Sequence, residues 1–217
     1  HFFRLCGTVI MSRRMNVFIS FILLSVTAVA AAAEQELEIA APFTNNMVLQ
    51  RQTVVPVWGF DTPDAHVTVE FAGQKKTAVA DKYGDWMVKL NPLAVSHKER
   101  SLTVTNNRNE SIVLQGVLVG EVWFSSGQSN MVWIANKSMC NEIAREIASS
   151  EKDIPIREIN IHTVSALYPQ KKGTSDGGWK TCKSAGNFSA LSLSFAYTLH
   201  KELDMPIGIL LSAHSNT

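Results

Sequence analysis

The residues that could do chemistry gather in one short stretch, GEVWFSSGQSNMVW, at positions 120–133. An apolar run leads there into Gly127, Gln128, Ser129 and Asn130. A serine at a turn from a buried strand into a helix presents its hydroxyl at the open end of a sheet, beside backbone N–H groups that stabilise an oxyanion. This pattern predicts acyl transfer, in which Ser129 attacks a carbonyl and a histidine removes its proton.

Gln128 and Asn130 flank the predicted nucleophile, and we expect them to orient substrate or brace the loop. The alternative is purely structural, because Ser and Asn are also common helix caps. The nucleophile elbow of α/β-hydrolases, G-x-S-x-G, is not matched, since Met131 occupies the last position.

The elements around this stretch must position Ser129. Residues 117–126 form a continuous apolar run, typical of a strand buried on both faces of a parallel sheet. Four-residue apolar spacing then predicts a helix, followed by a strand at 156–164, a second helix, and a strand at 205–212. The apolar stripe of the first helix is Met139, Ile143 and Ile147, and that of the second is Leu191, Phe195, Leu199 and Leu203.

This alternation predicts an α/β domain over residues 117–217 with a flavodoxin-like parallel sheet, in which the third strand adjoins the first. Ligands bind such sheets beyond the carboxyl ends of the strands, where Ser129 is expected. Three strands would leave the sheet edges poorly covered, so we expect this domain to be truncated.

Residues 34–116 have a different rhythm, with short β-rich segments separated by Gly, Pro, Asn and Asp. They predict a small antiparallel β-sandwich domain. Val67, Val69 and Phe71 alternate with polar residues, so these three side chains are expected on one face of a strand. A second alternating set consists of Trp86, Val88 and Leu90.

The block GEVWFSSGQSNM at 120–131 resembles the nucleophile block of the sialate O-acetylesterase family, a branch of the SGNH hydrolases. Four more segments resemble that family in the same order. They are FTNNMVLQR (43–51), VPVWGFDTPDAHVTV (55–69), DWMVKLNPL (85–93) and FSALSLSFAYTLHKELDMPIGIL (188–210). Several co-linear motifs make a chance match improbable, and the resemblance runs from about residue 38 to the last residue.

The resemblance implies that Ser129 is the nucleophile of an esterase that removes O-acetyl groups from sialic acids or related acetylated glycans. It implies a partial SGNH fold beside the β domain, with no metal and no organic cofactor. The chain is expected to be incomplete relative to the family and inactive as written.

Two departures from the family pattern support that expectation. The last strand of the resemblance usually leads into a Ser-Ser-Trp-Gly-Gly-Thr type of sequence, but here Ser215 and Asn216 replace both glycines, which puts one oxyanion donor in doubt. The family's Asp-x-x-His segment, which supplies the general base, is not found in these 217 residues. His214 follows the third parallel strand and is a weaker candidate base. His162 is expected to be structural, on a strand.

The first 33 residues resemble a secretory signal peptide with upstream residues before Met11. Arg13 and Arg14 precede a ten-residue apolar stretch and a run of A-x-A cleavage candidates. A membrane anchor is the alternative, but the apolar part is short for a span. We therefore expect a secreted or lysosomal protein with no membrane segment after cleavage.

Export favours disulfides and N-glycosylation. Cys140 and Cys182 are therefore predicted to form a disulfide, with two separate buried thiols as the alternative. Asn109, Asn136 and Asn187 each begin an N-x-Ser sequon.

The composition excludes some function classes. A net charge of +1 with no basic block argues against nucleic-acid binding. No Cys or His pair shows metal-ligand spacing, so no zinc site is expected. Besides the esterase, one hypothesis stays open, a non-catalytic glycan-binding or remnant protein with a vestigial Ser129 loop. A lipase or thioesterase is weaker, because no long apolar lid segment occurs.

Overall fold

The structure is a computed structural model that describes residues 35–151, 153–162 and 164–214. The predicted signal peptide and the Ser215–Asn216 substitution lie outside these residues. The strands are β1 (Glu38–Ile39), β2 (Val48–Gln50), β3 (Val55–Phe60), β4 (His66–Phe71), β5 (Gln74–Val79), β6 (Asp85–Leu90), β7 (Ser96–Asn106), β8 (Ser111–Gly127), β9 (Ile156–Asn160) and β10 (Ile207–Ala213). The helices are α1 (Ser129–Val132), α2 (Asn141–Ser149) and α3 (Ala190–Leu203), with 3₁₀ turns η1 (Ala135–Lys137) and η2 (Cys182–Asn187).

The first part of the chain folds into two sheets that share a hydrophobic core. One sheet has the order β1-β3-β6, and the other contains β5-β4-β7-β8. Both predicted alternations are confirmed, because Val67, Val69 and Phe71 of β4 are buried, as are the three apolar residues of β6. The arrangement is not purely antiparallel as predicted, since β2 pairs parallel with β8.

Strand β8 connects this region to the predicted nucleophile. It is 17 residues long, pairs antiparallel with β7 through its first half, and pairs parallel with β10 from Glu121 onward. Gly116 has a φ of 70° at the bulge where the β7–β8 register shifts. The domain boundary predicted at residues 116 and 117 therefore coincides with a bulge inside one strand, where a flexible linker would otherwise be expected.

The carboxyl half of β8 forms a parallel sheet in the order β8-β10-β9. The predicted adjacency of the first and third strands is thus observed. A flavodoxin-like order would place β9 on the free side of β8, but β9 lies beyond β10. Strand β2 occupies part of that side of β8. Its backbone pairs with residues 118–120, and the side chain of Gln50 accepts a hydrogen bond at Oε1 from the Val122 N–H at 2.8 Å.

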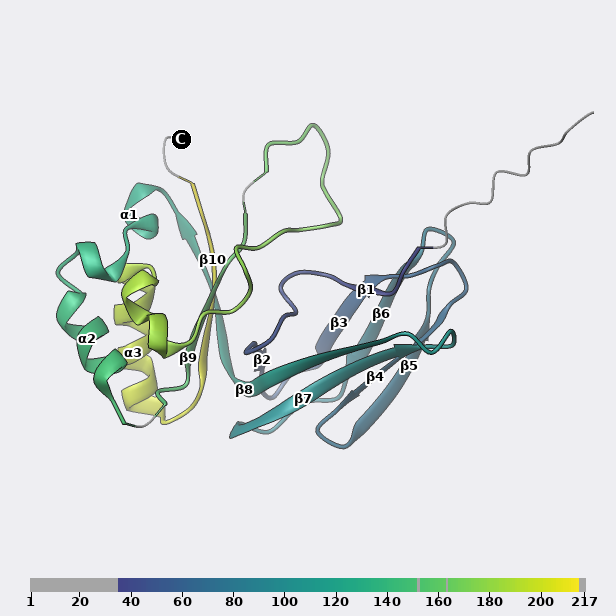
Figure 1. Cartoon of the computed structure of the whole chain (residues 1–217), viewed down its shortest axis with the longest axis horizontal. Helices are drawn as coiled ribbons and strands as arrows, with labels where there is room; N and C mark the ends of the chain where they lie inside the picture. The colour runs from purple at the N-terminus through teal and green to yellow at the C-terminus, as the bar shows by residue number, and fades with distance from the viewer. Residues whose placement is uncertain (1–34, 152, 163, 215–217) are drawn as a thin grey trace, which may run out of the picture. The chain divides into compact units, whose positions relative to one another are not determined.

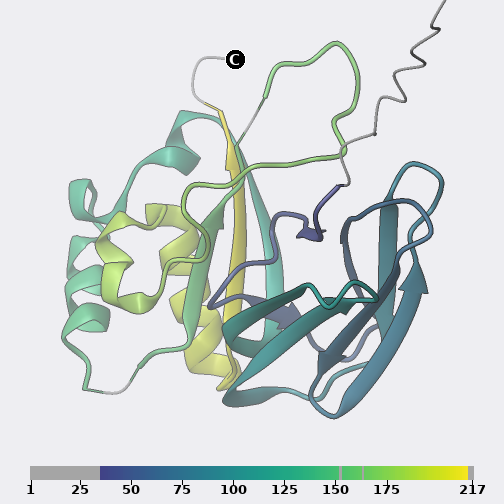
Figure 2. The same ribbon diagram turned by 45° about the vertical axis from the view of Figure 1, so that its right-hand side comes forward.

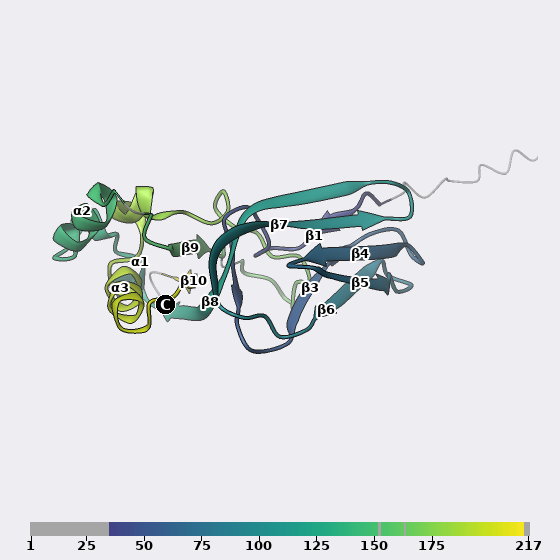
Figure 3. The ribbon, with the colours of Figure 1, turned by 90° about the horizontal axis from the view of Figure 1, so that it is seen from below.

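The helices lie on one face of the parallel sheet, and the strands that precede β8 lie on the other side (Figures 1 and 3). Helix α3 packs on β10 with a face different from the predicted one. Its buried residues include Leu193 and Ala196, whereas Leu191 and Phe195 of the predicted stripe are about half exposed. The small residues on the buried face let the helix approach the sheet closely, and Phe195 packs edge-on against Trp123 of β8.

Two other boundaries differ from the sequence prediction. Met139 precedes α2 and is fully exposed, so the apolar stripe of that helix begins at Ile143. Strand β9 ends at Asn160, four residues earlier than predicted. The chain then forms a long loop that reaches the first sheets (Figure 2), where the Trp179 Nε1–H donates to the Pro42 carbonyl at 2.8 Å.

Candidate active site

Ser129 lies two residues after the end of β8, at the carboxyl end of the parallel sheet. It is the first residue of α1 and is exposed, as are Gln128 and Asn130. Gly127 makes the turn possible, because its φ is 149° and a Cβ there would approach Met131 Cγ to 2.8 Å. The position is the one expected for a presented nucleophile, and the catalytic role of Ser129 remains a prediction.

The alternative reading of Ser129 as a helix cap does not fit the structure. The N-cap of α1 is Gln128, and Ser129 and Asn130 are the first and second helical residues. Helix α1 has only four residues, so its dipole adds little to an oxyanion site. Oxyanion stabilisation would therefore depend on individual N–H groups of the turn.

His214 ends the described chain next to this turn. Ala213 of β10 is in register with Gly127, and the His214 backbone N–H donates to the Gly127 carbonyl at 3.1 Å. The sheet order thus brings the backbone of His214 to the root of the Ser129 turn.

Sequence reasoning missed a histidine–aspartate pair at the same edge of the sheet. His162 lies just past β9, is exposed, and contacts the Asp176 carboxylate through Nε2. The Asn160 amide also donates to Asp176, at 2.9 Å. Hydrogen bonds from His162 and then from Asn160 lower the pKa of Asp176 below its usual value. His162 therefore does not lie on a strand as expected, and its structural role remains a prediction.

The His162–Asp176 pair is separated from the Ser129 turn by the width of β10. Neighbouring strands lie about 4.8 Å apart, so the axes of β8 and β9 are roughly 10 Å apart. His214 directly follows the intervening strand β10, so its backbone lies nearer to the Ser129 turn.

The predicted Cys140–Cys182 disulfide is not formed in the structure. Both cysteines are free thiols, although they contribute to the same apolar cluster beneath α2 and η2. The Cys182 thiol instead donates to Asp153 Oδ1 at 2.8 Å. Burial, followed by this hydrogen bond, raises the pKa of Cys182 to about 11, so the thiol stays protonated at neutral pH.

The three predicted glycosylation sites, Asn109, Asn136 and Asn187, are all exposed. This exposure makes each sequon accessible, and modification remains a prediction. Among the described residues, no group of three or more His, Cys, Asp or Glu side chains could hold a metal ion. No helix in the described part of the chain is long and apolar enough to cross a membrane.

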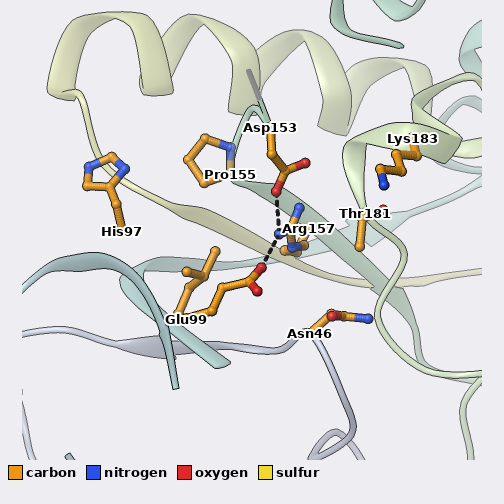
Figure 4. Close-up of a pocket in the computed structure, with 9 residues that line it drawn as sticks. Asn46, His97, Glu99, Asp153, Pro155, Arg157, Thr181 and Lys183 are labelled. Atoms are coloured by element: carbon orange, nitrogen blue, oxygen red, sulfur yellow. Dashed lines mark hydrogen bonds and ion pairs between the residues drawn. The ribbon is translucent and has the colours of Figure 1, made fainter. Parts of the chain in front are cut away.

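Two cavities lie near opposite ends of the parallel strands. A largely apolar one of about 550 Å³ lies beside the predicted nucleophile and is lined by Asn130, Trp133 and Leu191 among others. A polar one of about 510 Å³ lies near the start of β9 (Figure 4). There the buried Arg157 guanidinium lies between Asp153 and Glu99, with Nη2 at 2.8 Å and 3.3 Å from their carboxylates.

Arg157 and Asp153 form a charge-paired junction in that polar cavity. Burial alone would raise the pKa of Asp153, but hydrogen bonds from Arg157 and Cys182 lower it overall. The cavity lies at the amino ends of the strands, away from Ser129. The apolar cavity is lined by Asn130, the residue that follows Ser129.

No protein-family model matches the chain. Curated relatives are sialate O-acetylesterases: the chain is 27% identical over 216 residues to the protein of Mus musculus and 28% identical over 195 residues to that of Homo sapiens. These alignments cover 90% and 82% of this chain but 39% and 37% of the relatives, so the chain spans about two fifths of their length.

A solved structure gives the same indication. The crystal structure of a carbohydrate acetylesterase from Xanthomonas citri superposes with a TM-score of 0.74 at 30% identity, over 82% of this chain and 40% of that one. Together, these relatives confirm the resemblance predicted from the GEVWFSSGQSNM block and its companion motifs.

Proposed function

We propose that this chain, a relative of the sialate O-acetylesterases, carries the serine nucleophile of a carbohydrate O-acetylesterase. The observation that carries the proposal is the place of Ser129, which is exposed, two residues beyond the last residue of β8, and at the carboxyl end of a parallel sheet. The substrate would be an O-acetylated sialic acid or a related acetylated glycan. Its sugar would occupy the apolar cavity beside Asn130.

In this mechanism, Ser129 Oγ attacks the acetyl carbonyl carbon and the sugar oxygen leaves as an alcohol. The proton lost by Ser129 passes through a base to that leaving oxygen. Water then hydrolyses the acetyl-enzyme and releases acetate. N–H groups of the turn, together with Gln128 and Asn130, would stabilise the oxyanion and orient the ester.

In this proposal the general base is a histidine. The backbone of His214 adjoins the Ser129 turn, which makes the His214 imidazole the candidate base. The second candidate function is non-catalytic glycan binding by the same cavity.

Hydrolysis of a chromogenic acetyl ester tests the nucleophile. Ser129→Ala should abolish turnover above background, while the exposed neighbour Ser126→Ala should retain it. Equal loss in both variants, or retention in both, would contradict the assignment of Ser129. If the unmodified chain shows no turnover but binds acetylated sialic acid, the glycan-binding function is the correct one.

Substrate choice is tested by acetate release from O-acetylated sialic acid and from acetylated xylo-oligosaccharide, compared at equal concentration. We also propose export through the secretory pathway to the lysosome or the extracellular space. Expression in secreting cells should then give a glycosidase-sensitive mass shift, which substitution of Asn109, Asn136 and Asn187 together should remove.

A further inference from the structure

A buried carboxylate lies on β9, the outer strand of the parallel sheet. Glu158 of β9 is fully buried, and both of its carboxylate oxygens accept from the backbone N–H of Ser189, at 3.2 Å and 3.0 Å. Burial raises the pKa of Glu158 to about 7, although the hydrogen bond from Ser189 and the charge of Lys180 act in the opposite direction. A buried acid with this single backbone donor calls for a reason beyond packing.

Ser189 links this acid to the end of β8. It is the N-cap of α3, and its Oγ accepts from the Ser192 N–H at 3.3 Å. The Ser192 hydroxyl lies 2.8 Å from the hydroxyl of Ser125 in β8. Ser125 precedes Ser129 by four residues, so this link holds the strand that leads into the turn.

The same segment also holds the chain that leaves the turn. Ser189 forms an antiparallel bridge with Ile134. The Ala190 N–H donates to the Trp133 carbonyl at 2.7 Å, and the Ala135 N–H donates to the Phe188 carbonyl at 2.9 Å. Because Trp133 follows Ser129 by four residues, both ends of the Ser129 turn are attached to the first turn of α3.

We propose that Glu158 is a positioning residue for Ser129, and that its ionisation sets how firmly the first turn of α3 holds both ends of the Ser129 turn. The proposal rests on the proposed function only in giving Ser129 its catalytic role. Hydrogen bonds to an ionised acceptor are roughly twice as strong as neutral ones. The ionised form therefore fixes Ser189 firmly, and protonation loosens the attachment of residues 125–135.

Few other ionisable groups face Glu158, so we expect Glu158 to be the group that changes charge near neutral pH. Lys180 lies opposite Glu158 in an isolated β-bridge, where the Lys180 N–H donates to the Glu158 carbonyl at 2.7 Å and the Glu158 N–H donates to the Lys180 carbonyl at 3.1 Å. Helix α3 contributes no ionisable side chain in its first turn, and β10 has none along its length. The positive end of the α3 dipole also faces this region and favours the ionised form.

Backbone amide chemical shifts, followed by nuclear magnetic resonance from pH 5.5 to 8.5, test this link without relying on activity. The amides of Ser189, Ala190, Ala135 and Ser129 should titrate with one common midpoint near neutral pH. Glu158→Gln, which is nearly isosteric, should abolish this titration. The matched control Glu142→Gln removes an exposed carboxylate of α2 and should leave the titration unchanged.

Two further variants separate the possible outcomes. His214→Ala is a control, because imidazoles also titrate in this range and His214 adjoins Gly127. If Glu158 is the titrating group, this variant should retain the common midpoint. Ser192→Ala should keep the titration of Ser189 but reduce its amplitude at Ser129 by more than half. The proposal is overturned if Ser129 does not titrate with Ser189, or if its titration survives Glu158→Gln.

The esterase assay keeps this proposal distinct from the proposed function. If the amides titrate together but Ser129→Ala still hydrolyses acetyl esters, the nucleophile is wrong and the link stands. If Ser129 is required, kcat should fall below neutral pH with little change in KM, and Glu158→Gln should lose that limb of the profile. An unaltered limb would contradict the positioning role even if Ser129 is the nucleophile.

Discussion

The carbonyl oxygen of Gly127 accepts a hydrogen bond from the backbone N–H of His214 at 3.1 Å, which places the ends of β8 and β10 side by side. These residues are 87 positions apart in the sequence, and each stands at the carboxyl end of its strand. The root of the Ser129 turn is therefore fixed by a strand pairing between distant segments.

Gly127 should be intolerant of a side chain. Its φ of 149° is rarely adopted by other residues, and an added Cβ would lie 2.8 Å from Met131 Cγ. We expect Gly127→Ala to destabilise the fold by at least about 1 kcal/mol and to shift the amide signals of the turn. Urea unfolding measures the first effect. Gly73→Ala is the matched control for a glycine with positive φ and no atom within 4 Å, and it should leave the signals of the Ser129 turn in place.

The buried face of α3 gives a matched pair of substitutions. Leu193 is fully buried against the sheet, whereas Leu191 is 51% exposed. Leu193→Ala should lower the free energy of unfolding by about 2 to 5 kcal/mol because it leaves a cavity. Leu191→Ala should change it by less than about 1 kcal/mol. The reverse order would mean that the helix packs through the stripe expected from the sequence.

The raised pKa of Glu158 predicts how the free energy of unfolding depends on pH. Its pKa is about 7 in the fold against an ordinary value of 4.5, so between these values the folded chain holds a proton that the unfolded chain has lost. Its contribution to the free energy of unfolding therefore falls as pH rises from 4.5 to 7, by on the order of 3 kcal/mol, and is flat above that range.

Urea unfolding at pH 5 and pH 8 measures this difference. Glu158→Gln should reduce the loss of stability between the two values, while Glu142→Gln should not. Other carboxyl groups with shifted pKa values, such as Asp153 and Asp176, have lowered values and act mainly below pH 4. A variant with the same pH dependence as the unmodified chain would show that Glu158 is ionised at low pH.

The two described cysteines should differ in reactivity. Cys182 is buried with its pKa raised to about 11, while Cys140 is partly exposed. Because thiolate is the reactive form, iodoacetamide at pH 8 should label Cys140 well before Cys182. Peptide mass mapping locates the label. If neither cysteine reacts until a reductant is added, the disulfide predicted from the sequence exists after all.

Local pattern determined the strands of the first sheets. Val67, Val69 and Phe71 alternate with polar neighbours, and period-two alternation leaves little choice about which face is buried. The small polar block that leads to Ser129 likewise indicated the end of a buried strand, since such residues are poor core material, although Ser125, Ser126 and Gly127 still belong to β8.

Long-range pairing decided the rest. The sequence predicted that α3 would bury the stripe with Leu191 and Phe195, but the helix buries a face with Leu193 and Ala196. The position of β9 beyond β10 is a strand order that no local pattern in the sequence specifies. The burial of Glu158, the His162–Asp176 contact and the partner of Cys182 all arise from segments that meet only in the folded chain. Sequence alone could nominate Ser129, but only the tertiary structure shows which groups hold its turn, because those contacts depend on distances between residues that no local pattern encodes.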